Sequence, residues 1–517
     1  MRLVNRIGIV ALAALVLAGP AHAARDASAP VAWPGGTAVI SYESEAALRT
    51  ALARHPARVV RRVEPLRVVA LRPAGDIGAY AARIRSEPGI VRVERAASRR
   101  SFAEPALGLD ASAIPFQWQY AAIGADLVPA DVAAAVGGLT IAVVDTGADV
   151  TAPDLGAKQL QLYSIRRRTS EVTDVNGHGT FVSALAAGSS TNGDGIAGVA
   201  GKAGLLVIQA GDPSGAFTDV EEAAAIVYAV ERGARIINLS LGGQGTSTTE
   251  RRAVEYAASK NVLIVAAAGN GGLRGSPVEY PAALLQPPGS NGVGGVGLSV
   301  AATDRSGAHA PFSTGGSHIS LAAPGANVFS AVAGTSSETR YPRTVLPGSA
   351  GGHYGYGSGT SFASPQVAGA AALVWAANPR LRAPDVASIL EQTASGAGSW
   401  NPQLGYGIVN VPAAIEAART AEPSAAPLTP PTAPAVLRVD SRRVGKRVTL
   451  SWRRVDGATL YRVNARTNGR SRLLGTGSRT TATFSFAPGT HHLTVTALDL
   501  ARTAVAVSRP LRVQVRR

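Results

Sequence analysis

A short apolar stretch, LTIAVVDTG at residues 139–147, decides the fold class of this 517-residue chain. An uninterrupted apolar run of this length, ending at Asp145, is typical of a strand buried on both faces. Similar runs follow in GLLVIQAG, ARIINLSLGG, NVLIVAAAGN and GLSVAATD, and helical stretches such as TDVEEAAAIVYAVERG lie between them. This alternation predicts an α/β domain with a mainly parallel sheet covered by helices on both faces.

In a parallel sheet the functional residues gather beyond the carboxyl ends of the strands. Asp145 ends the first strand, and Asn270 ends the strand in NVLIVAAAGN. His178, in NGHGTFVSALAAG, and Ser361, in GSGTSFASP, each begin a predicted helix; we expect Pro365 in the first turn of the second one. A serine hydroxyl becomes a nucleophile when a histidine takes its proton and a buried carboxylate orients that histidine. The amide of Asn270 would face the oxyanion that then forms.

Each of these residues also has an ordinary structural explanation. Aspartate at a strand end and Asn-Gly pairs are common in turns, and serine or threonine often caps a helix. The tripeptide Gly-Thr-Ser occurs again at 245–247 and 334–336, so it proves nothing alone. The order Asp, His, Asn, Ser on parallel-sheet signals is what favours a catalytic site.

The motifs VVDTG, NGHGT, AAGN and GTSFASP resemble those of the subtilisin-like serine proteases, the subtilase family (peptidase S8), over about residues 112–418. The resemblance implies the subtilisin-like three-layer fold and a serine endopeptidase that works through an acyl-enzyme. By the same resemblance, His178 is the general base, Asp145 orients it, and Ser361 is the nucleophile. The Asn270 side chain and the Ser361 N–H would donate hydrogen bonds to the oxyanion. The related sedolisins have a glutamate in place of the histidine and an aspartate in the oxyanion hole, which His178 and Asn270 disfavour.

The resemblance also implies substrate-binding residues. Those that resemble the strand that pairs with the substrate backbone are Ser240, Leu241 and Gly242. Tyr280, in YPA, would lie in the wall of the pocket for the side chain before the cut bond, with Glu279 near its floor. A carboxylate there would favour lysine or arginine and would fit a cut after Arg100 in ASRRSF. The alternative is that Glu279 faces solvent and the pocket takes large apolar side chains.

Two segments precede the predicted peptidase domain. Residues 1–23 have the pattern of a signal peptide, with Arg2, Arg6, an apolar run and AHA before the cleavage point; an N-terminal membrane anchor is the alternative. Residues 24–104 show the βαββαβ pattern of a ferredoxin-like α+β domain and resemble the inhibitory propeptide of the family. We therefore expect an autoprocessed precursor that is exported and then secreted, periplasmic or held at the cell surface.

The peptidase domain is assigned to residues 105–421, a proline-rich linker to 422–434 and an all-β sandwich to 435–517. The sandwich resembles a fibronectin type III domain, with Trp452 and Tyr461 as expected core aromatics. His491 and His492 stand where that family often has a tyrosine.

The net charge of +16 is unevenly distributed. Residues 435–517 carry +14, residues 24–104 carry +6, and residues 105–434 carry −6, which suits docking of the N-terminal segment on the peptidase domain. The basic C-terminal domain predicts binding to a polyanionic surface rather than to nucleic acid; the alternative is a merely soluble, arginine-rich domain. The chain has no cysteine, which excludes disulfides, thiolate metal sites and a cysteine nucleophile.

Protein or peptide substrates and the chain's own propeptide are the other expected partners. No cofactor or metal site is predicted; the family resemblance allows a structural calcium ion, whose ligands the sequence does not identify. A catalytically silent or surface-binding protein led by the basic C-terminal domain is the alternative function.

Overall fold

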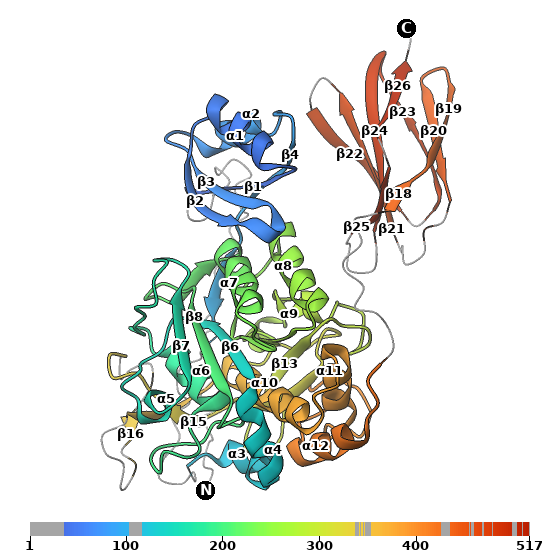
Figure 1. The fold of residues 1–517 in the computed structure, drawn as a ribbon. Helices are drawn as coiled ribbons and strands as arrows, with labels where there is room; N and C mark the ends of the chain where they lie inside the picture. The colour runs from blue at the N-terminus through green and yellow to red at the C-terminus, as the bar shows by residue number, and fades with distance from the viewer. Residues whose placement is uncertain are drawn as a thin grey trace, which may run out of the picture.

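The computed structural model describes residues 36–102, 116–336, 341, 343–344, 346 and 353–424, and in the C-terminal part 435–453, 455, 460–467, 470–477, 479–498, 504–508 and 510–515. These residues form three units, coloured blue, cyan to orange, and orange to red along the chain (Figure 1). The predicted signal peptide and most of the predicted linker lie outside the described residues.

The N-terminal unit is a four-stranded antiparallel sheet with two helices. Its elements are β1 (Ala38–Tyr42), α1 (Glu45–Arg54), β2 (Arg58–Val63), β3 (Val68–Arg72), α2 (Ile77–Ile84) and β4 (Ile90–Arg95). The strand order β2-β3-β1-β4 confirms the predicted ferredoxin-like pattern. Ser44 and Asp76 begin the two helices, because their side chains accept hydrogen bonds from the first-turn N–H groups.

The central unit is built on a seven-stranded parallel sheet. In the order in which they lie side by side, its strands are β14 (Leu321–Pro324), β13 (Leu298–Thr303), β12 (Leu263–Ala267), β10 (Ile236–Leu239), β6 (Thr140–Asp145), β8 (Gly204–Gln209) and β7 (Leu160–Ser164). All six neighbouring pairs run parallel. The quoted stretch is β6, which is buried along its length except at Thr140.

Helices cover both faces of this sheet. Side chains of β6 alternate between two cores: Ile141 and Val143 face the layer of α6 (His178–Ala187) and α10 (Thr360–Ala377). Ala142 and Val144 face the layer of α7 (Asp219–Glu231) and α8 (Thr248–Ser259). The predicted three-layer α/β fold is thereby confirmed. The remaining helices are α3 (Trp118–Ala122), α4 (Ala130–Ala135), α5 (Pro153–Gly156), α9 (Ala282–Leu285), α11 (Ala383–Gln392) and α12 (Val411–Thr420).

Two small antiparallel sheets lie outside the central sheet. One joins β15 (Val328–Ala331), β17 (Tyr354–Gly357) and β16 (Arg343–Thr344). The other places β5 (Ser98–Ser101), which follows the N-terminal unit, between β11 (Leu241–Gly242) and β9 (Ala216–Thr218) of the central unit. The N-terminal unit thus sits over α7 and α8 and continues directly into the central unit (Figure 1).

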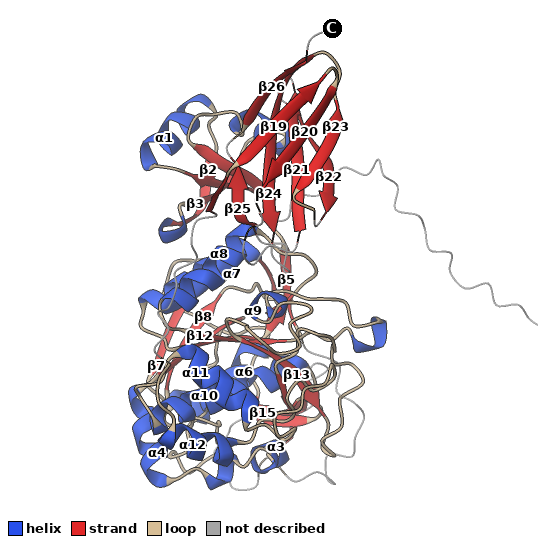
Figure 2. Cartoon of the chain, turned by 90° about the vertical axis from the view of Figure 1, so that its right-hand side faces the viewer, coloured by secondary structure: helices blue, strands red, loops and turns tan. Residues whose placement is uncertain are grey.

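The C-terminal unit consists of strands and loops (Figure 2). Its strands are β18 (Ala435–Leu437), β19 (Val439–Val444), β20 (Arg447–Trp452), β21 (Leu460–Thr467), β22 (Arg470–Gly477), β23 (Thr481–Ser485), β24 (Gly489–Leu498), β25 (Ala504–Ser508) and β26 (Leu511–Val515). They form two sheets around one shared core, which confirms the predicted all-β sandwich. Trp452 and Tyr461 are core residues with ring centroids 5.3 Å apart, as expected. His491 is also buried, against Phe486, where its Nδ1 lies 2.7 Å from the Thr467 hydroxyl.

Candidate active site

The structure brings Asp145 and His178 into direct contact. Asp145 ends β6, and His178 is the first residue of α6. The Nδ1 atom of His178 lies 2.8 Å from Oδ1 and 3.0 Å from Oδ2 of Asp145, and both side chains are buried. A carboxylate at this distance holds the proton on Nδ1 and leaves Nε2 as the atom that can accept one.

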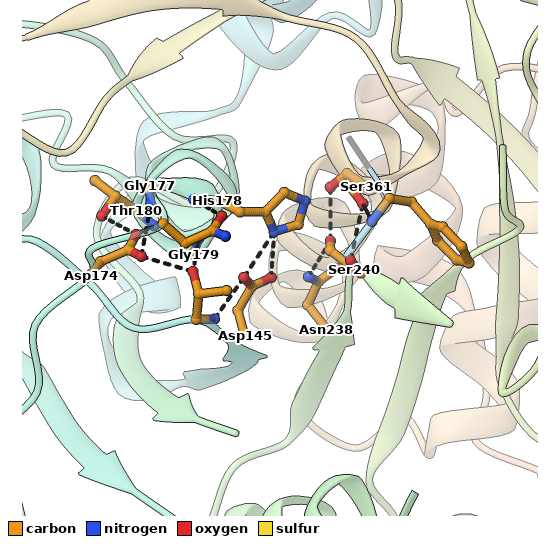
Figure 3. A network of polar contacts seen from close by, with 12 residues as sticks. Asp145, Asp174, Gly177, His178, Gly179, Thr180, Asn238, Ser240 and Ser361 are labelled. Carbon is orange, nitrogen blue, oxygen red and sulfur yellow. Dashed lines mark hydrogen bonds and ion pairs between the residues drawn. The ribbon is translucent and has the colours of Figure 1, made fainter. Parts of the chain in front are cut away.

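A second buried carboxylate, Asp174, fixes the start of α6. Its Oδ1 accepts hydrogen bonds from the Thr146 hydroxyl at 2.8 Å and from Gly177 N–H at 2.9 Å. Its Oδ2 accepts from the N–H and the hydroxyl of Thr180 at 2.8 and 2.6 Å. Asp174 therefore ties the first turn of α6 to the residue after Asp145, and so sets the position of His178 (Figure 3). The sequence analysis missed this role, although an aspartate just ahead of a predicted helix is a capping signal.

Ser361 is the second residue of α10, and its hydroxyl lies on the open side of the histidine (Figure 3). The hydroxyl donates to the carbonyl of Ser240 at 2.9 Å and accepts from the N–H of Phe102 at 3.0 Å. The Nε2 atom of His178 is buried and has no hydrogen-bond partner among the described residues. The structure thus places the three predicted triad residues together, with the Asp–His hydrogen bond formed and the serine hydroxyl bonded elsewhere.

The position of Pro365 differs from our expectation. It is the sixth residue of α10 rather than part of the first turn, so its missing N–H leaves the carbonyl of Ser361 without a helical partner. The hydroxyl of Ser240 donates to that carbonyl at 2.7 Å and replaces the missing bond. Asn238 in turn holds Ser240 through a 2.9 Å bond from its amide to the hydroxyl. The proline is therefore compatible with α10, because the Ser240 hydroxyl, from the residue between β10 and β11, replaces the missing backbone hydrogen bond.

Asn270 is oriented by the same helix start. Its Oδ1 accepts from the N–H and the hydroxyl of Thr360 at 3.0 and 2.9 Å, which leaves the Nδ2 group on the other side. Nδ2 has no hydrogen-bond partner among the described residues and is buried. It lies 3.3 Å from the position of a Cβ on Gly359, and the carbonyl oxygen of Phe102 lies 2.3 Å from that same position. The free amide is thus directed to the place where a backbone carbonyl enters the site.

A segment of the chain's own N-terminal part occupies this place. Arg100 and Ser101 of β5 pair with Gly242 and Leu241 of β11, in the antiparallel sense. Phe102 follows, with its N–H on Ser361 and its ring close to Gly242, where an added Cβ would lie 2.6 Å from the ring. The register puts Phe102, not Arg100, beside Ser361. The sequence analysis expected Arg100 at this position, but the arginine pair lies within the paired strand, two residues earlier.

Glu279 and Tyr280 border this region. Tyr280 exchanges two backbone hydrogen bonds of 3.0 Å with Gly243 and so anchors the end of β11. Glu279 is 3% exposed and does not face solvent as the alternative required. It lines a cavity of about 450 Å³ with Arg100, Arg274 and Gly242. Burial raises the pKa of Glu279, and the charges of Arg100 and Arg274 oppose that rise.

Among the described residues, no cluster of three or more His, Cys, Asp or Glu side chains is arranged to hold a metal ion. Within the same residues, no helix combines the length and the apolar character that a membrane span requires.

The comparisons with known proteins agree with this geometry. The model of the subtilase family matches residues 137–407. Thermitase of Thermoactinomyces vulgaris is 36% identical over 266 residues, which cover 51% of this chain and 84% of thermitase. Subtilisin DY of Bacillus licheniformis is 34% identical over 299 residues, covering 57% and 98% of the two chains.

Two further matches differ in coverage. The thermophilic serine proteinase of Bacillus sp. strain AK1 is 35% identical over 280 residues, 54% of this chain and 62% of that protein, so the chain spans less than two thirds of this relative. Among solved structures, fervidolysin from Fervidobacterium pennivorans, described as a keratinolytic enzyme related to subtilisin, superposes with a TM-score of 0.65. The match covers 93% of this chain and 76% of fervidolysin at 24% identity, and shows a shared fold.

Proposed function

Because the chain belongs to the subtilase family, we propose that it is a serine endopeptidase with Asp145, His178 and Ser361 as its triad and Asn270 as an oxyanion donor. The Asp145–His178 contact, with Nε2 free on the side of Ser361, supports this proposal most directly. The Ser361 hydroxyl reaches the histidine by rotating about its side-chain bond, away from the carbonyl of Ser240. Such contacts tighten when a substrate is in place.

The reaction follows from these positions. Oγ of Ser361 bonds to the substrate carbonyl carbon while its proton moves to Nε2 of His178, and Asp145 stabilises the imidazolium. Nδ2 of Asn270 donates to the carbonyl oxygen as it becomes negative. The carbon–nitrogen bond then breaks, and the amine leaves with the proton from Nε2. In the second half a water gives one proton to Nε2 and its oxygen to the acyl carbon, and Ser361 recovers its proton as the acid leaves.

The N-terminal unit is proposed to be an inhibitory propeptide that the enzyme removes from itself. β5, which follows this unit, pairs with β11 as a substrate backbone would, and the N–H of Phe102 donates to the Ser361 hydroxyl. The proposed cut is the peptide bond after Phe102. Export through the signal peptide at residues 1–23 is part of the same proposal, supported by the sequence pattern of those residues.

Labelling with a fluorophosphonate tests the proposal. The secreted protein should be labelled at Ser361 and should digest casein, whereas Ser361→Ala should do neither and should keep its N-terminal unit. In subtilisin, loss of the nucleophile lowers turnover about 2 × 10⁶-fold, and we expect a loss of that order here. A Ser361→Ala protein that matures and digests casein would refute the assignment, and an unlabelled wild type would favour the catalytically silent alternative.

A second function is proposed for the C-terminal unit, namely attachment to polyanions such as acidic polysaccharide. It carries 17 Lys and Arg against three Asp. Several of these side chains are exposed on the β19–β20 hairpin or just before it: Arg438, Arg442, Arg443, Lys446 and Arg447. A concentrated positive field of this kind attracts anionic polymers without a shaped pocket.

A further inference from the structure

Arg99 of β5 is a buried arginine, and its side chain has no exposed surface. An arginine is seldom fully buried unless its charge is paired. Along β5, Arg99 and Ser101 point to one face of the strand, and Arg100 and Phe102 point to the other. Arg100 is exposed, so the two neighbouring arginines differ completely in environment.

Two glutamates of the central unit receive Arg99. Its Nε lies 3.0 Å from Oε2 of Glu222 and 3.1 Å from Oε1 of Glu250, and its Nη2 lies 2.6 Å from Oε2 of Glu250. Glu222 belongs to the first turn of α7, and Glu250 to the first turn of α8. Both carboxylates are fully buried, as is the Asp219 carboxylate at the start of α7.

The pocket contains three buried carboxyl groups and one guanidinium, that of Arg99. Burial, followed by the charge of Glu250, raises the pKa of Glu222, while Arg99 opposes the rise. Burial also raises the pKa of Asp219 to about 6. Oε1 of Glu222 has no hydrogen-bond partner among the described residues. Glu222, Glu250 and Asp219 form what is here called the acidic pocket. A guanidinium at these distances stabilises the ionised carboxylates of Glu222 and Glu250, which burial alone disfavours.

The carboxyl groups of the acidic pocket belong to the central unit. The guanidinium that they bind is that of Arg99, on the β5 strand that lies in the active site. Counting back from Phe102, Arg99 is the fourth residue before the proposed cut. The register is fixed by the pairs of Arg100 with Gly242 and of Ser101 with Leu241, so a foreign peptide on β11 would place its fourth residue at the same point. On removal of the N-terminal unit the two glutamates lose their partner and are open to a substrate.

We propose that the acidic pocket is a specificity site, and that the enzyme selects polypeptides with arginine at the fourth residue before the cut bond. The inference rests on the proposed endopeptidase function. Arginine fits better than lysine. The planar guanidinium has several N–H groups and can contact Glu222 and Glu250 at the same time, whereas the lysine ammonium is a compact point charge. An apolar side chain in this position would leave both carboxylates buried without a cation.

A set of matched peptides tests the proposal on the mature wild-type enzyme. The parent is an internally quenched octapeptide with the sequence of residues 97–104, ASRRSFAE. The residue corresponding to Arg99 is varied as arginine, lysine, citrulline and leucine; citrulline has the shape of arginine without its charge. Rates are normalised to active sites titrated with a fluorophosphonate. We expect kcat/KM for arginine to exceed that for citrulline and leucine about 30-fold or more.

Control measurements separate the outcomes. Citrulline at the position of the exposed Arg100 should change kcat/KM little, and the products should show one cut, after phenylalanine. Glu222→Gln and Glu250→Gln should reduce the preference for arginine over citrulline, whereas Glu231→Gln, at the exposed end of α7, should not. If Glu222→Gln and Glu250→Gln fail to mature, the kcat/KM values of the wild-type enzyme for the four peptides still test the proposal.

Equal cleavage of the arginine, citrulline and leucine peptides, or a cut after a different residue, would overturn the specificity proposal while leaving the endopeptidase intact. Absence of both labelling and cleavage would instead refute the proposed function.

Discussion

The two terminal units are both basic, but they use their charge in opposite ways. Residues 24–104 carry +6 and residues 435–517 carry +14. Val39, Val63 and Val68 of the N-terminal unit belong to the same hydrophobic cluster as α7 and α8 of the central unit. The core of the C-terminal unit is made entirely of residues between Leu437 and Val515. The more weakly charged unit is the one that is packed onto the peptidase core.

This difference shows that the position of a charge matters more than the total. Arg99 acts at fixed distances inside a closed pocket, where added salt screens it little. Arg442, Arg443 and Arg447 are exposed on β19 and β20, so their attraction to a partner is screened by salt. We therefore expect the central unit to bind the N-terminal unit through a close fit and specific ion pairs. We expect the C-terminal unit to attract its partner through its overall positive electrostatic potential.

The largest effect is expected from removing the buried cation. In a Ser361→Ala background, which preserves the uncut chain, Arg99→Met leaves Glu222 and Glu250 buried without a partner. Breaking a buried ion pair in this way costs about 3–5 kcal/mol. Urea unfolding and limited proteolysis should show a less stable protein whose N-terminal unit is cut more readily.

The matched control is Arg100→Met, one residue further along and exposed. It should change the unfolding free energy by less than about 0.5 kcal/mol, as surface substitutions usually do. Equal effects of the two variants would mean that the buried pairing contributes nothing to docking, and would remove the contrast between the two units.

Asn270→Ala should act on the docked strand and on foreign peptides alike. The corresponding donor in subtilisin is worth about 10²–10³ in turnover, and we expect a similar loss here with KM little changed. If the N-terminal unit is cut as a substrate, its release should slow by the same factor. Pulse-chase measurement of maturation beside peptide kinetics tests this; normal maturation with slow peptide cleavage would show that another agent cuts the precursor.

The candidate site residues could be predicted from the sequence because each is marked by signals in the sequence immediately around it. Asp145 ends a buried strand and Asn270 follows another. His178 and Ser361 lie in the first turns of helices. Recognising strand ends and helix starts in the sequence was therefore enough to predict that these four residues lie together. The three-layer sheet, the ferredoxin-like unit and the all-β unit followed from the same periodicities. Pro365 was misplaced by one turn because the compensating hydroxyl of Ser240 comes from a residue distant in sequence.

The acidic pocket could not be predicted for a related reason. Glu222 and Glu250 lie near helix starts, where an acidic residue is expected from the helix dipole alone. Arg99 lies in an arginine-rich segment, so its sequence context is no different from that of Arg100. Only the register of β5 on β11 separates a buried arginine from an exposed one, and that register is a tertiary property. The same register moved the proposed cut from Arg100 to Phe102.

A smaller effect is expected at Glu279, the buried carboxyl beside the docked strand. Because burial raises the pKa of Glu279, its neutral form persists to higher pH than in an exposed glutamate. As the pH rises through this pKa the carboxyl ionises, and it should then favour arginine before the cut bond. The ratio of kcat/KM for a peptide with arginine there to one with phenylalanine should rise with pH by up to about tenfold. Any effect of pH on the catalytic steps that the two peptides share cancels in the ratio.

Glu279→Gln is the control. A glutamine does not titrate, so the ratio of kcat/KM for the arginine peptide to that for the phenylalanine peptide should not change with pH in this variant. A pH-independent ratio in the wild type would show that Glu279 does not meet the side chain before the cut bond. Phenylalanine would then be preferred for the fit of its ring against Gly242 alone.

The smallest effect on catalysis is expected from deleting residues 425–517. The core of the C-terminal unit is self-contained, so the triad geometry should not depend on it, and kcat/KM on the octapeptide should stay within about twofold. Retention on immobilised heparin should fall sharply, and that of the full chain should weaken as salt rises, because the attraction acts over a Debye length of about 8–10 Å. Retention that ignores salt would point to a shaped site, and retention unaffected by the deletion would place the binding surface elsewhere. Either result would contradict the contrast drawn between the N-terminal unit, which binds through specific ion pairs, and the C-terminal unit, which attracts polyanions through its overall charge.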